Sequence, residues 1–223
     1  MTGAPGRLHR VGIIGDIHGE DDALEAVLAF LCSGGPLEAL LCTGDLIAKR
    51  GAGNVERCCG LLDAARVRTI RGNHDRWYLE NAGMRALPGD PAADLSPSCR
   101  AFLCSLPPTR EFETPLGPLL LCHGVGDDDL LGVYPRGADA DVFRMLEACG
   151  LPGRFRLLVN GHTHERMVRA LPGLTIVNAG SLCRGEEPGF LLADFETGTV
   201  CQFDLAPSTN KITKAAEIAL LPA

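Results

Sequence analysis

The sequence predicts an α/β fold, and three observations support this prediction. Short apolar segments with the length of buried strands alternate with amphipathic helical segments through the first half of the chain. Motifs of Gly, Asp, Asn and His directly follow several of these apolar segments. Sites in α/β proteins collect at the carboxyl ends of strands, so the motifs also predict where a site lies. At 223 residues the chain fits one domain, spanning residues 1–223.

The first half of the chain predicts three strands and two helices. Acidic residues in the first turn favour the first helix, and Asn54 is a good N-cap for the second. The strands are predicted at residues 10–14, 39–42 and 67–70, and the helices at residues 21–31 and from Asn54 to about Ala65.

The second half predicts a hairpin and further strands separated by turn residues. Residues 81–96 are rich in Pro, Gly and Ala and are interpreted as a loop beside the site. Helices are predicted at residues 97–106 and 138–149, the hairpin at 110–113 and 118–122, and strands at 157–160, 175–178, 190–195 and 200–204.

The charge balance bears on the partners. The formal net charge is -7 and the sequence pI is near 5.4. A protein that grips duplex nucleic acid without sequence preference usually presents a basic face, so no duplex nucleic acid is expected here. Small or flexible substrates are favoured, although bound metal would neutralise several of the carboxylates.

The cysteines and the apolar segments indicate the compartment. The ten cysteines include no CxxC pair, and most lie beside apolar residues, where a free thiol acts as a small buried hydrophobe. Examples are Cys32, Cys42, Cys104, Cys122 and Cys201. No signal peptide and no segment of roughly 20 apolar residues is recognised, so no membrane association is expected. A cytoplasmic location is the prediction.

Five short motifs carry the chemistry and contain five of the six histidines. Asp, Asn and His together supply oxygen and imidazole ligands, a set that suits first-row divalent metals. In chain order the motifs are GDIHG (15–19), TGD (43–45), RGNHD (71–75), CHG (122–124) and GHTH (161–164). The chain is therefore predicted to be a two-metal hydrolase.

These motifs resemble the ordered signature of the calcineurin-like metallophosphoesterase superfamily: D-x-H, G-D, G-N-H-D/E, H and G-H-x-H. The resemblance runs from Asp16 to His164. It implies a four-layer α/β/β/α sandwich of two mixed β-sheets flanked by helices, and two divalent metal ions per chain. It also implies their ligands: Asp16, His18 and His164 for the first metal, Asp45 as a bridge, and Asn73, His123 and His162 for the second.

The resemblance also implies catalytic groups. His74 is expected to protonate the leaving-group oxygen or to bind a phosphate oxygen while a metal-bridging hydroxide attacks phosphorus. Asp75 would orient that imidazole, and the alternative is a helix cap before Arg76. The segment NAGSLCR resembles the family's N-P-G-S turn, and Arg184 at its end is a candidate phosphate clamp or else a solvated surface residue. Asp127, Asp128 and Asp129 are interpreted as a solvated loop.

The predicted activity is hydrolysis of small phosphodiesters, because GNHD and GHTH resemble the small bacterial phosphodiesterase branch. A protein phosphatase or a dinucleoside polyphosphate hydrolase is the alternative, but that branch carries GDxxDRG and GNHE where this chain has GDLIAKRG and Asp75. The third hypothesis is a non-catalytic protein interaction scaffold with the same fold. Mn is the expected metal, with Fe, Ni, Co and Zn open because ligand type does not select among them. The oligomeric state stays open.

Overall fold

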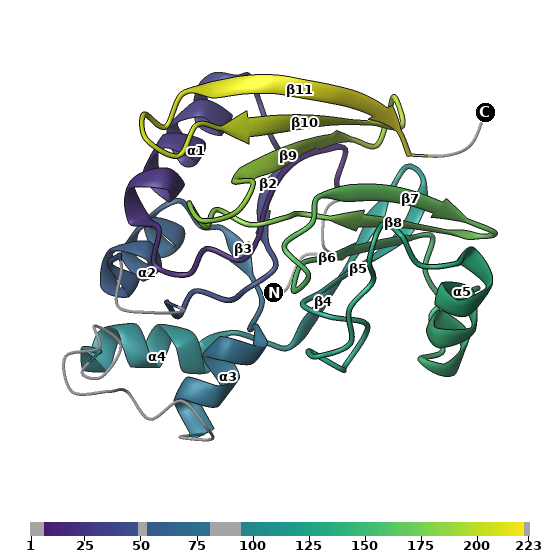
Figure 1. Ribbon diagram of the computed structural model, residues 1–223, viewed down its shortest axis with the longest axis horizontal. Coiled ribbons are helices and arrows are strands. Elements are labelled where there is room, and N and C mark those ends of the chain that lie inside the picture. The colour runs from purple at the N-terminus through teal and green to yellow at the C-terminus, as the bar shows by residue number, and fades with distance from the viewer. Residues whose placement is uncertain (1–6, 49–52, 81–94, 221–223) are drawn as a thin grey trace.

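The computed structural model describes residues 7–48, 53–80 and 95–220. Within them, eleven strands form two mixed sheets (Figure 1). The strands are β1 (Arg10–Ile14), β2 (Ala39–Cys42), β3 (Arg68–Thr69), β4 (Thr109–Thr114), β5 (Gly117–Cys122), β6 (Leu157–Asn160), β7 (Met167–Leu171), β8 (Leu174–Asn178), β9 (Gly189–Asp194), β10 (Thr199–Leu205) and β11 (Ile212–Ala219). The helices are α1 (Asp21–Ser33), α2 (Val55–Ala64), α3 (Asn73–Glu80), α4 (Pro97–Ser105) and α5 (Asp139–Ala148).

Both sheets combine three neighbouring parallel strands with antiparallel strands, at one side of the first sheet and at both edges of the second. The first has the order β11-β10-β9-β1-β2-β3, in which β1, β2 and β3 are parallel. The second has the order β4-β5-β6-β8-β7, in which β5, β6 and β8 are parallel. Parallel strands need crossover connections, and α1 and α2 supply them in the first sheet.

The strands alternate their apolar side chains between two faces, which produces four layers. Val11 and Ile13 of β1 pack between the sheets against Leu119 and Leu121 of β5. Their neighbour Ile14 faces the other way, toward a core shared with α1, α2 and α4. The outer face of the second sheet packs against α5. The predicted α/β/β/α sandwich of two mixed sheets is confirmed.

Most predicted elements are present with shifted ends. The strands at 10–14, 39–42 and 157–160 have the predicted bounds, and the Asn54 side chain caps α2 by accepting the amide of Arg57 at 3.0 Å. The third strand is only two residues long, β3. Most of the predicted loop at 81–96 lies outside the described residues, and Ser96 is the N-cap of α4.

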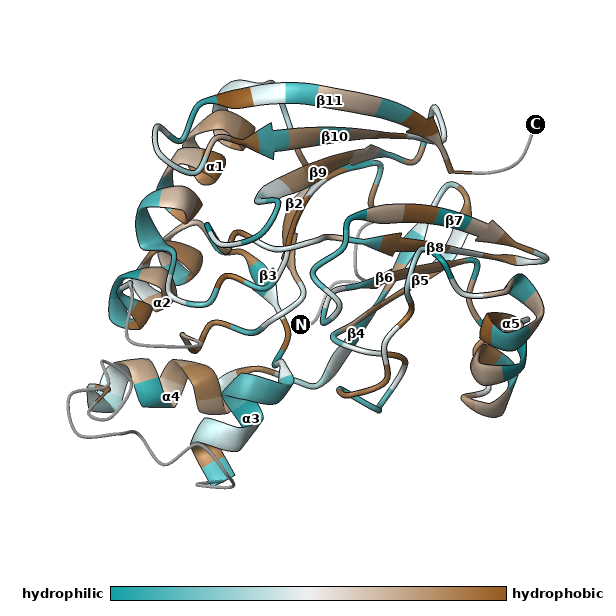
Figure 2. Cartoon of the chain, in the orientation of Figure 1, coloured by the Kyte–Doolittle hydropathy of each residue, from teal (hydrophilic) through white to brown (hydrophobic). Residues whose placement is uncertain are grey.

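Two strands, β7 and β11, have no counterpart in the prediction. β11 is an edge strand with mostly exposed side chains, and its mixed hydropathy contrasts with the mostly apolar β10 beside it (Figure 2). Its three Ala residues weaken the β propensity that Ile212, Thr213 and Ile218 give it, and pairing with β10 makes this segment a strand. Among the described residues, no helix is long and apolar enough to cross a membrane.

The interpretation of the cysteines was correct in part. Cys42 and Cys122 are fully buried in the core, as expected for small hydrophobes. Cys32 and Cys104 are exposed, and Cys201 is half-buried. The exposed pair lies on the outer faces of α1 and α4, where an apolar neighbour in sequence does not mean a buried neighbour in space.

Candidate metal centre

The predicted ligands lie where the parallel strands of both sheets end. Asp16 and His18 follow β1, Asp45 follows β2 and Asn73 follows β3. From the second sheet, His123 follows β5, and His162 and His164 follow β6. All seven predicted ligands come together at this shared edge, which agrees with the general location of sites in α/β proteins.

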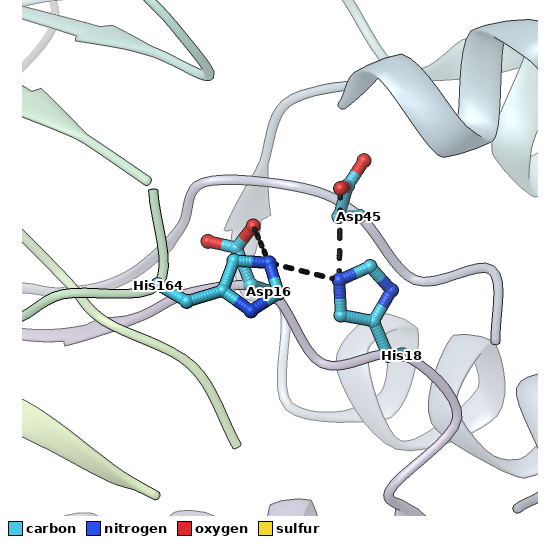
Figure 3. Close-up of side chains that lie close together, drawn as sticks. All are labelled: Asp16, His18, Asp45 and His164. Atoms are coloured by element: carbon cyan, nitrogen blue, oxygen red, sulfur yellow. Dashed lines mark hydrogen bonds and ion pairs between the residues drawn. The ribbon is translucent and has the colours of Figure 1, made fainter. Parts of the chain in front are cut away.

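One set of side chains gathers around Asp16, as Figure 3 shows. Ligand atoms of Asp16, His18, Asp45 and His164 all lie within 4.8 Å of one another. His164 Nε2 is 3.2 Å from both Asp16 Oδ1 and His18 Nε2. We call Asp16, His18 and His164 the first ligand group.

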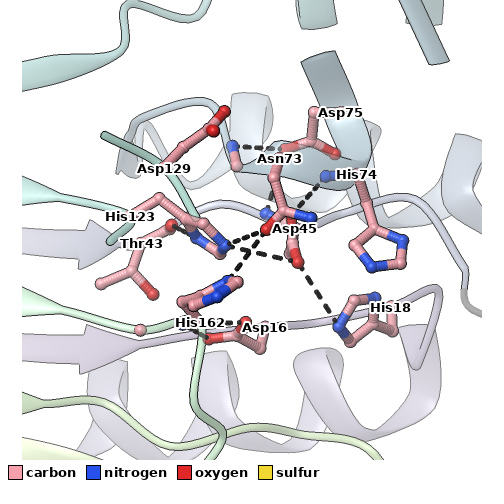
Figure 4. Close-up of polar contacts among 12 residues, drawn as sticks. Asp16, His18, Thr43, Asp45, Asn73, His74, Asp75, His123, Asp129 and His162 are labelled. Atoms are coloured by element: carbon pink, nitrogen blue, oxygen red, sulfur yellow. Dashed lines mark hydrogen bonds and ion pairs between the residues drawn. The ribbon is translucent and has the colours of Figure 1, made fainter. Parts of the chain in front are cut away.

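A second set gathers around Asn73, as Figure 4 shows. Asn73 Oδ1 is 2.8 Å from His123 Nε2 and 3.0 Å from His162 Nδ1. We call Asn73, His123 and His162 the second ligand group. Asp45 lies between the groups, since its Oδ2 is 3.4 Å from His123 Nε2 and 3.7 Å from His18 Nε2. That position suits a carboxylate shared by two ions.

Three of the histidines are oriented by acceptors behind them. Nδ1 of His18 is 2.9 Å from the Ile47 carbonyl oxygen, and Nδ1 of His123 is 2.7 Å from the Thr43 carbonyl oxygen. Nδ1 of His164 contacts the Glu186 carboxylate. Carbonyl and carboxylate oxygens accept, so Nδ1 of each ring carries a proton and Nε2 is the nitrogen that faces inward. An imidazole that donates from Nδ1 to an oxygen and faces inward with Nε2 is oriented as a metal ligand would be.

The inward atoms fit a cation. His123 Nε2 faces two acceptors, Asn73 Oδ1 and Asp45 Oδ2, so a positive charge at this nitrogen, either a proton or a metal ion, is stabilised there. Burial opposes charge on His123, but Asp45 outweighs burial and raises the pKa of His123 to about 10. Burial alone would raise the pKa of Asp45, but the positive charge of His123 acts against burial and the pKa of Asp45 is lowered. Burial lowers the pKa of His18 to about 4, which keeps it a neutral donor.

The backbone at these residues is strained. Asp16, His18, Asp45, His162 and His164 all have positive φ, between 44° and 68°. They are five of the seven non-glycine residues with positive φ in the described part of the chain. A non-glycine residue in this region costs of order 1 kcal/mol or more, and such residues cluster at functional sites. The fold therefore maintains these five turns against their local preference.

Two glycines allow the aspartates to approach the backbone. A Cβ on Gly72 would lie 2.2 Å from Asp45 Oδ1, and a Cβ on Gly161 would lie 2.3 Å from Asp16 Oδ2. Both distances are far below a possible contact, so any larger residue would displace a candidate ligand. This explains the glycine before Asn73 and the glycine before His162.

Asp75 does not orient His74 as predicted. Its carboxylate is fully buried and accepts four backbone N–H groups, from Gly72, Asp45, Leu46 and Ile47, at 2.8 to 3.1 Å. Through these bonds, Asp75 connects the turn that contains Asp45 with the turn that contains Asn73. Asp75 therefore positions the turns that carry the candidate metal ligands. Burial and the nearby Asp45 raise the pKa of Asp75 to about 7.

His74 lies at the rim of the first ligand group. Its backbone N–H donates to Asp45 Oδ1 at 2.9 Å. Its ring meets the ring of His18 edge-on, with centroids 5.0 Å apart, and lies 5.1 Å from the ring of Trp77. The side chain is half-buried, so the imidazole lies beside the candidate metal centre without being one of its inward-facing ligands.

Arg184 is not arranged as a phosphate clamp. Its Nε donates to Glu20 Oε2 at 2.9 Å, and its Nη1 donates to the Pro207 carbonyl oxygen at 2.9 Å. A bidentate phosphate clamp needs two adjacent guanidinium nitrogens, either Nε with Nη2 or Nη1 with Nη2. One nitrogen of each pair already donates, Nε to Glu20 and Nη1 to Pro207. The structure therefore gives Arg184 a role in joining the loop after β8 to the N-terminus of α1.

Two hollows flank the centre. One of about 740 Å³ is lined by His162 and His164 and by the exposed Tyr134. The other, of about 590 Å³, is lined by His123 and Arg71. No carboxylate among the described residues pairs with the Arg71 guanidinium, whereas Arg76 in the same hollow is held by both oxygens of Asp129. The prediction of a solvated acidic loop is therefore wrong for Asp129, which pairs with Arg76.

Sequence reasoning missed two residues of the site, Arg71 and Glu186. Arg71 stands inside the RGNHD motif, so its position next to Asn73 was a usable signal. Glu186 supports His164 from a loop 22 residues later, and nothing in the local sequence marks it.

The chain is similar in sequence to known proteins. The model of the calcineurin-like phosphoesterase superfamily domain matches residues 10–198. A probable metallophosphoesterase from Methanothermobacter thermautotrophicus is 29% identical over 171 residues, which cover 77% of this chain and 76% of that protein.

Solved structures show the same fold. A metallophosphoesterase from Sphaerobacter thermophilus superposes with a TM-score of 0.64 at 18% identity, covering 95% of this chain and 90% of its own. Vacuolar Protein Sorting 29 from Cryptosporidium parvum superposes with a TM-score of 0.56 at 17% identity, covering 96% of this chain and 100% of its own. At these identities the likeness concerns the fold alone.

Proposed function

Because the chain belongs to the calcineurin-like phosphoesterase superfamily, we propose that it is a metal-dependent phosphodiesterase that hydrolyses small phosphodiesters. The observation that carries this proposal is the arrangement of the two ligand groups around Asp45. Three imidazoles turn Nε2 inward, and the fourth, His162, turns Nδ1 toward Asn73 Oδ1. Two carboxylates and one amide oxygen complete the set. Seven donors exceed what one ion needs and suit a pair of ions.

The residues divide between two ions. Asp16, His18 and His164 would hold the first, Asn73, His123 and His162 would hold the second, and Asp45 would bind both. Divalent ions held there supply Lewis acidity at the phosphoryl oxygens and a water ionised enough to act as nucleophile at neutral pH. We propose Mn as the metal that serves best, with Fe, Ni, Co and Zn as alternatives.

His74 is proposed as the general acid. It lies at the rim of the centre, half-buried, where its imidazole can hold a proton next to a leaving-group oxygen. Its backbone N–H bond to Asp45 Oδ1 fixes it relative to the shared carboxylate. Asp75 supports this geometry from behind by holding the amides of the Asp45 turn.

The hollows support a diester over a monoester. Each opens onto a different part of the centre, one beside His164 and the other beside His123, and a diester has two substituents to place. Arg71 in the second hollow is the cation best placed for a phosphate oxygen, since its guanidinium has no carboxylate partner in the described part of the chain. Arg184 would have to release Glu20 or Pro207 first.

The alternatives differ in what they need from the site. A protein phosphatase or a dinucleoside polyphosphate hydrolase would use the same centre on other substrates. A scaffold would need no metal chemistry. The complete set of donors together with His74 favours catalysis over a scaffold.

The experiment is a metal and substrate matrix. The chain is stripped with chelator and assayed with bis(4-nitrophenyl) phosphate, 4-nitrophenyl phosphate, a cyclic nucleotide and a dinucleoside polyphosphate, each with Mn, Fe, Ni, Co or Zn. We expect turnover of the diester only with metal restored, and fastest with Mn. Equal turnover in chelator, or preference for the monoester or the polyphosphate, would contradict the proposal. Binding of metal without turnover of any ester would favour the scaffold.

A further inference from the structure

Two cysteines far apart in sequence meet in space. Cys59 of α2 and Cys99 of α4 have their Sγ atoms 3.2 Å apart and share a hydrogen bond. Both residues are nearly buried, with exposed fractions of 3% and 4%. A disulfide requires about 2.0 Å between the sulfurs, so a shift of roughly 1 Å would bring them to bonding distance.

A polar clamp beside the thiols fixes this approach. Ser96, the N-cap of α4, donates its hydroxyl to Glu56 Oε2 of α2 at 2.7 Å, and its backbone N–H donates to the same carboxylate. The Ser96 hydroxyl oxygen also accepts the amide N–H of Cys99 at 3.2 Å. The first turn of α4 is therefore tied to α2 within one turn of Cys59, which holds the two thiols opposite each other.

The two thiols have different reactivity. Cys99 is the third residue of α4, where the helix N-terminus stabilises a thiolate. The hydrogen bond with Cys59 lowers the pKa of Cys99, and the same bond together with burial raises the pKa of Cys59. Cys99 is therefore the better nucleophile, and Cys59 is the thiol that reacts second.

A small oxidant can reach the pair. A surface hollow of about 150 Å³ is lined by both cysteines together with Glu56, Gly60 and Phe102. This space admits a water-sized molecule such as hydrogen peroxide. The pair is thus open to a small oxidant.

We propose that Cys59 and Cys99 are a modification site that a hydroperoxide oxidises to a reversible disulfide between α2 and α4. The Cys99 thiolate attacks one peroxide oxygen, the O–O bond breaks, and the product is a sulfenic acid with hydroxide as leaving group. The Cys59 sulfur then attacks the Cys99 sulfur and displaces the sulfenic hydroxyl. In sum, two thiols and one hydrogen peroxide yield one disulfide and two waters.

The bond would enclose part of the candidate metal centre. The segment between the two cysteines carries Asn73 and His74, and α3 contacts α4. Neither cysteine is a candidate metal ligand, so this inference does not depend on the proposed phosphodiesterase activity. A reducing compartment keeps such a pair as thiols until an oxidant arrives.

The test is mass spectrometry of the folded chain. The exposed thiols are first removed by Cys32→Ser, Cys104→Ser and Cys149→Ser, so that they cannot couple chains together. The protein is treated with hydrogen peroxide, the remaining thiols are alkylated, and peptides are mapped without reduction. We expect the Cys59–Cys99 peptide pair to appear before any other cross-link and to vanish after dithiothreitol.

Matched variants assign the roles. Cys58→Ser changes the neighbouring buried cysteine and should leave the cross-link intact. Cys59→Ser should abolish it and leave a sulfenic acid on Cys99 that dimedone traps. A first cross-link at another pair, or a Cys59–Cys99 link that forms only after denaturant is added, would overturn the proposal. The wild-type chain, oxidised at a concentration low enough to keep chains from coupling, should give the same Cys59–Cys99 peptide pair. The test therefore does not depend on the folding of a variant.

Discussion

The two ligand groups have equal numbers of donors but unequal charge. The first group contains the Asp16 carboxylate and the second contains the neutral amide of Asn73 in the corresponding place. Both groups depend on Asp45, whose Oδ2 lies within 3.7 Å of a histidine nitrogen from each. Without Asp45, the second ion would therefore have no carboxylate ligand, whereas the first ion would still have the carboxylate of Asp16.

The support behind the groups differs too. His123 is anchored through a backbone carbonyl from the opposite sheet, in the buried centre of the molecule. His164 is anchored by the exposed Glu186 side chain, at the edge of a hollow. The second group is therefore held by the fold itself, and the first is held partly by a replaceable side chain. The predictions below test this contrast, from the largest expected effect to the smallest.

Asp45→Asn should disable both groups, with the heavier loss in the second. We expect at most one metal ion per chain and a fall in diester turnover of about 10³-fold or more, since the ions contribute several kcal/mol to the transition state and each 1.4 kcal/mol is about tenfold. Metal analysis and steady-state rates check this.

Asp127→Asn is the matched control, because Asp127 is an exposed carboxylate in the same hollow as His123. It should keep both ions and the full rate. Two tightly held ions in Asp45→Asn would refute the shared position of Asp45.

His74→Ala should separate chemistry from metal binding. Loss of a general acid costs about 10² to 10⁴ in rate for a poor leaving group and much less for an activated aryl group. We expect alkyl or nucleoside diesters to slow far more than bis(4-nitrophenyl) phosphate, with both ions retained. Rates on the substrate series and the metal content are the measurements.

His9→Ala serves as the control, since His9 contacts Glu196 on an exposed surface. If His74→Ala slows every ester by one common factor, His74 positions phosphate instead of donating a proton. No change in any rate would mean that the activity is incidental, and the scaffold would become the better account.

Asp75 differs from its predicted role, and its contacts show which features of the site the sequence does not predict. The ligands Asp16 to His164 could be named because their motifs resemble the family's ordered signature. Their common location followed from the predicted strands, since parallel strands bring their carboxyl ends to one edge. The partners of Asp75 include amides about 30 residues upstream, and the partner of Arg184 is Glu20, 164 residues upstream. Such contacts depend on which loops the two sheets bring together, which no local pattern encodes.

Asp75→Asn should weaken the support shared by both groups. The amide has one acceptor oxygen where the carboxylate has two, so some of the four backbone N–H groups lose their partner in a buried place. We expect a loss of about 1–3 kcal/mol in the free energy of unfolding of the metal-free chain. Denaturant titration measures it, and Asp63→Asn on the exposed face of α2 is the control. A metal-free stability equal to the wild type would mean that these four bonds contribute little.

Glu186→Gln should weaken metal binding by the first ligand group alone. Of the four substitutions, we expect it to have the smallest effect. The Glu186 carboxylate accepts from His164 Nδ1, which makes the ring a better donor at Nε2, and a neutral amide does this less well. Groups behind a metal ligand are worth about 10- to 100-fold in affinity, and an exposed one belongs at the low end, about tenfold. Metal titration of the chelated chain should show weaker binding of one ion and an unchanged second ion. Glu187→Gln changes the adjacent exposed residue of the same hollow and should alter neither affinity. Equal weakening of both ions in Glu186→Gln would show that the two groups are coupled through more than Asp45.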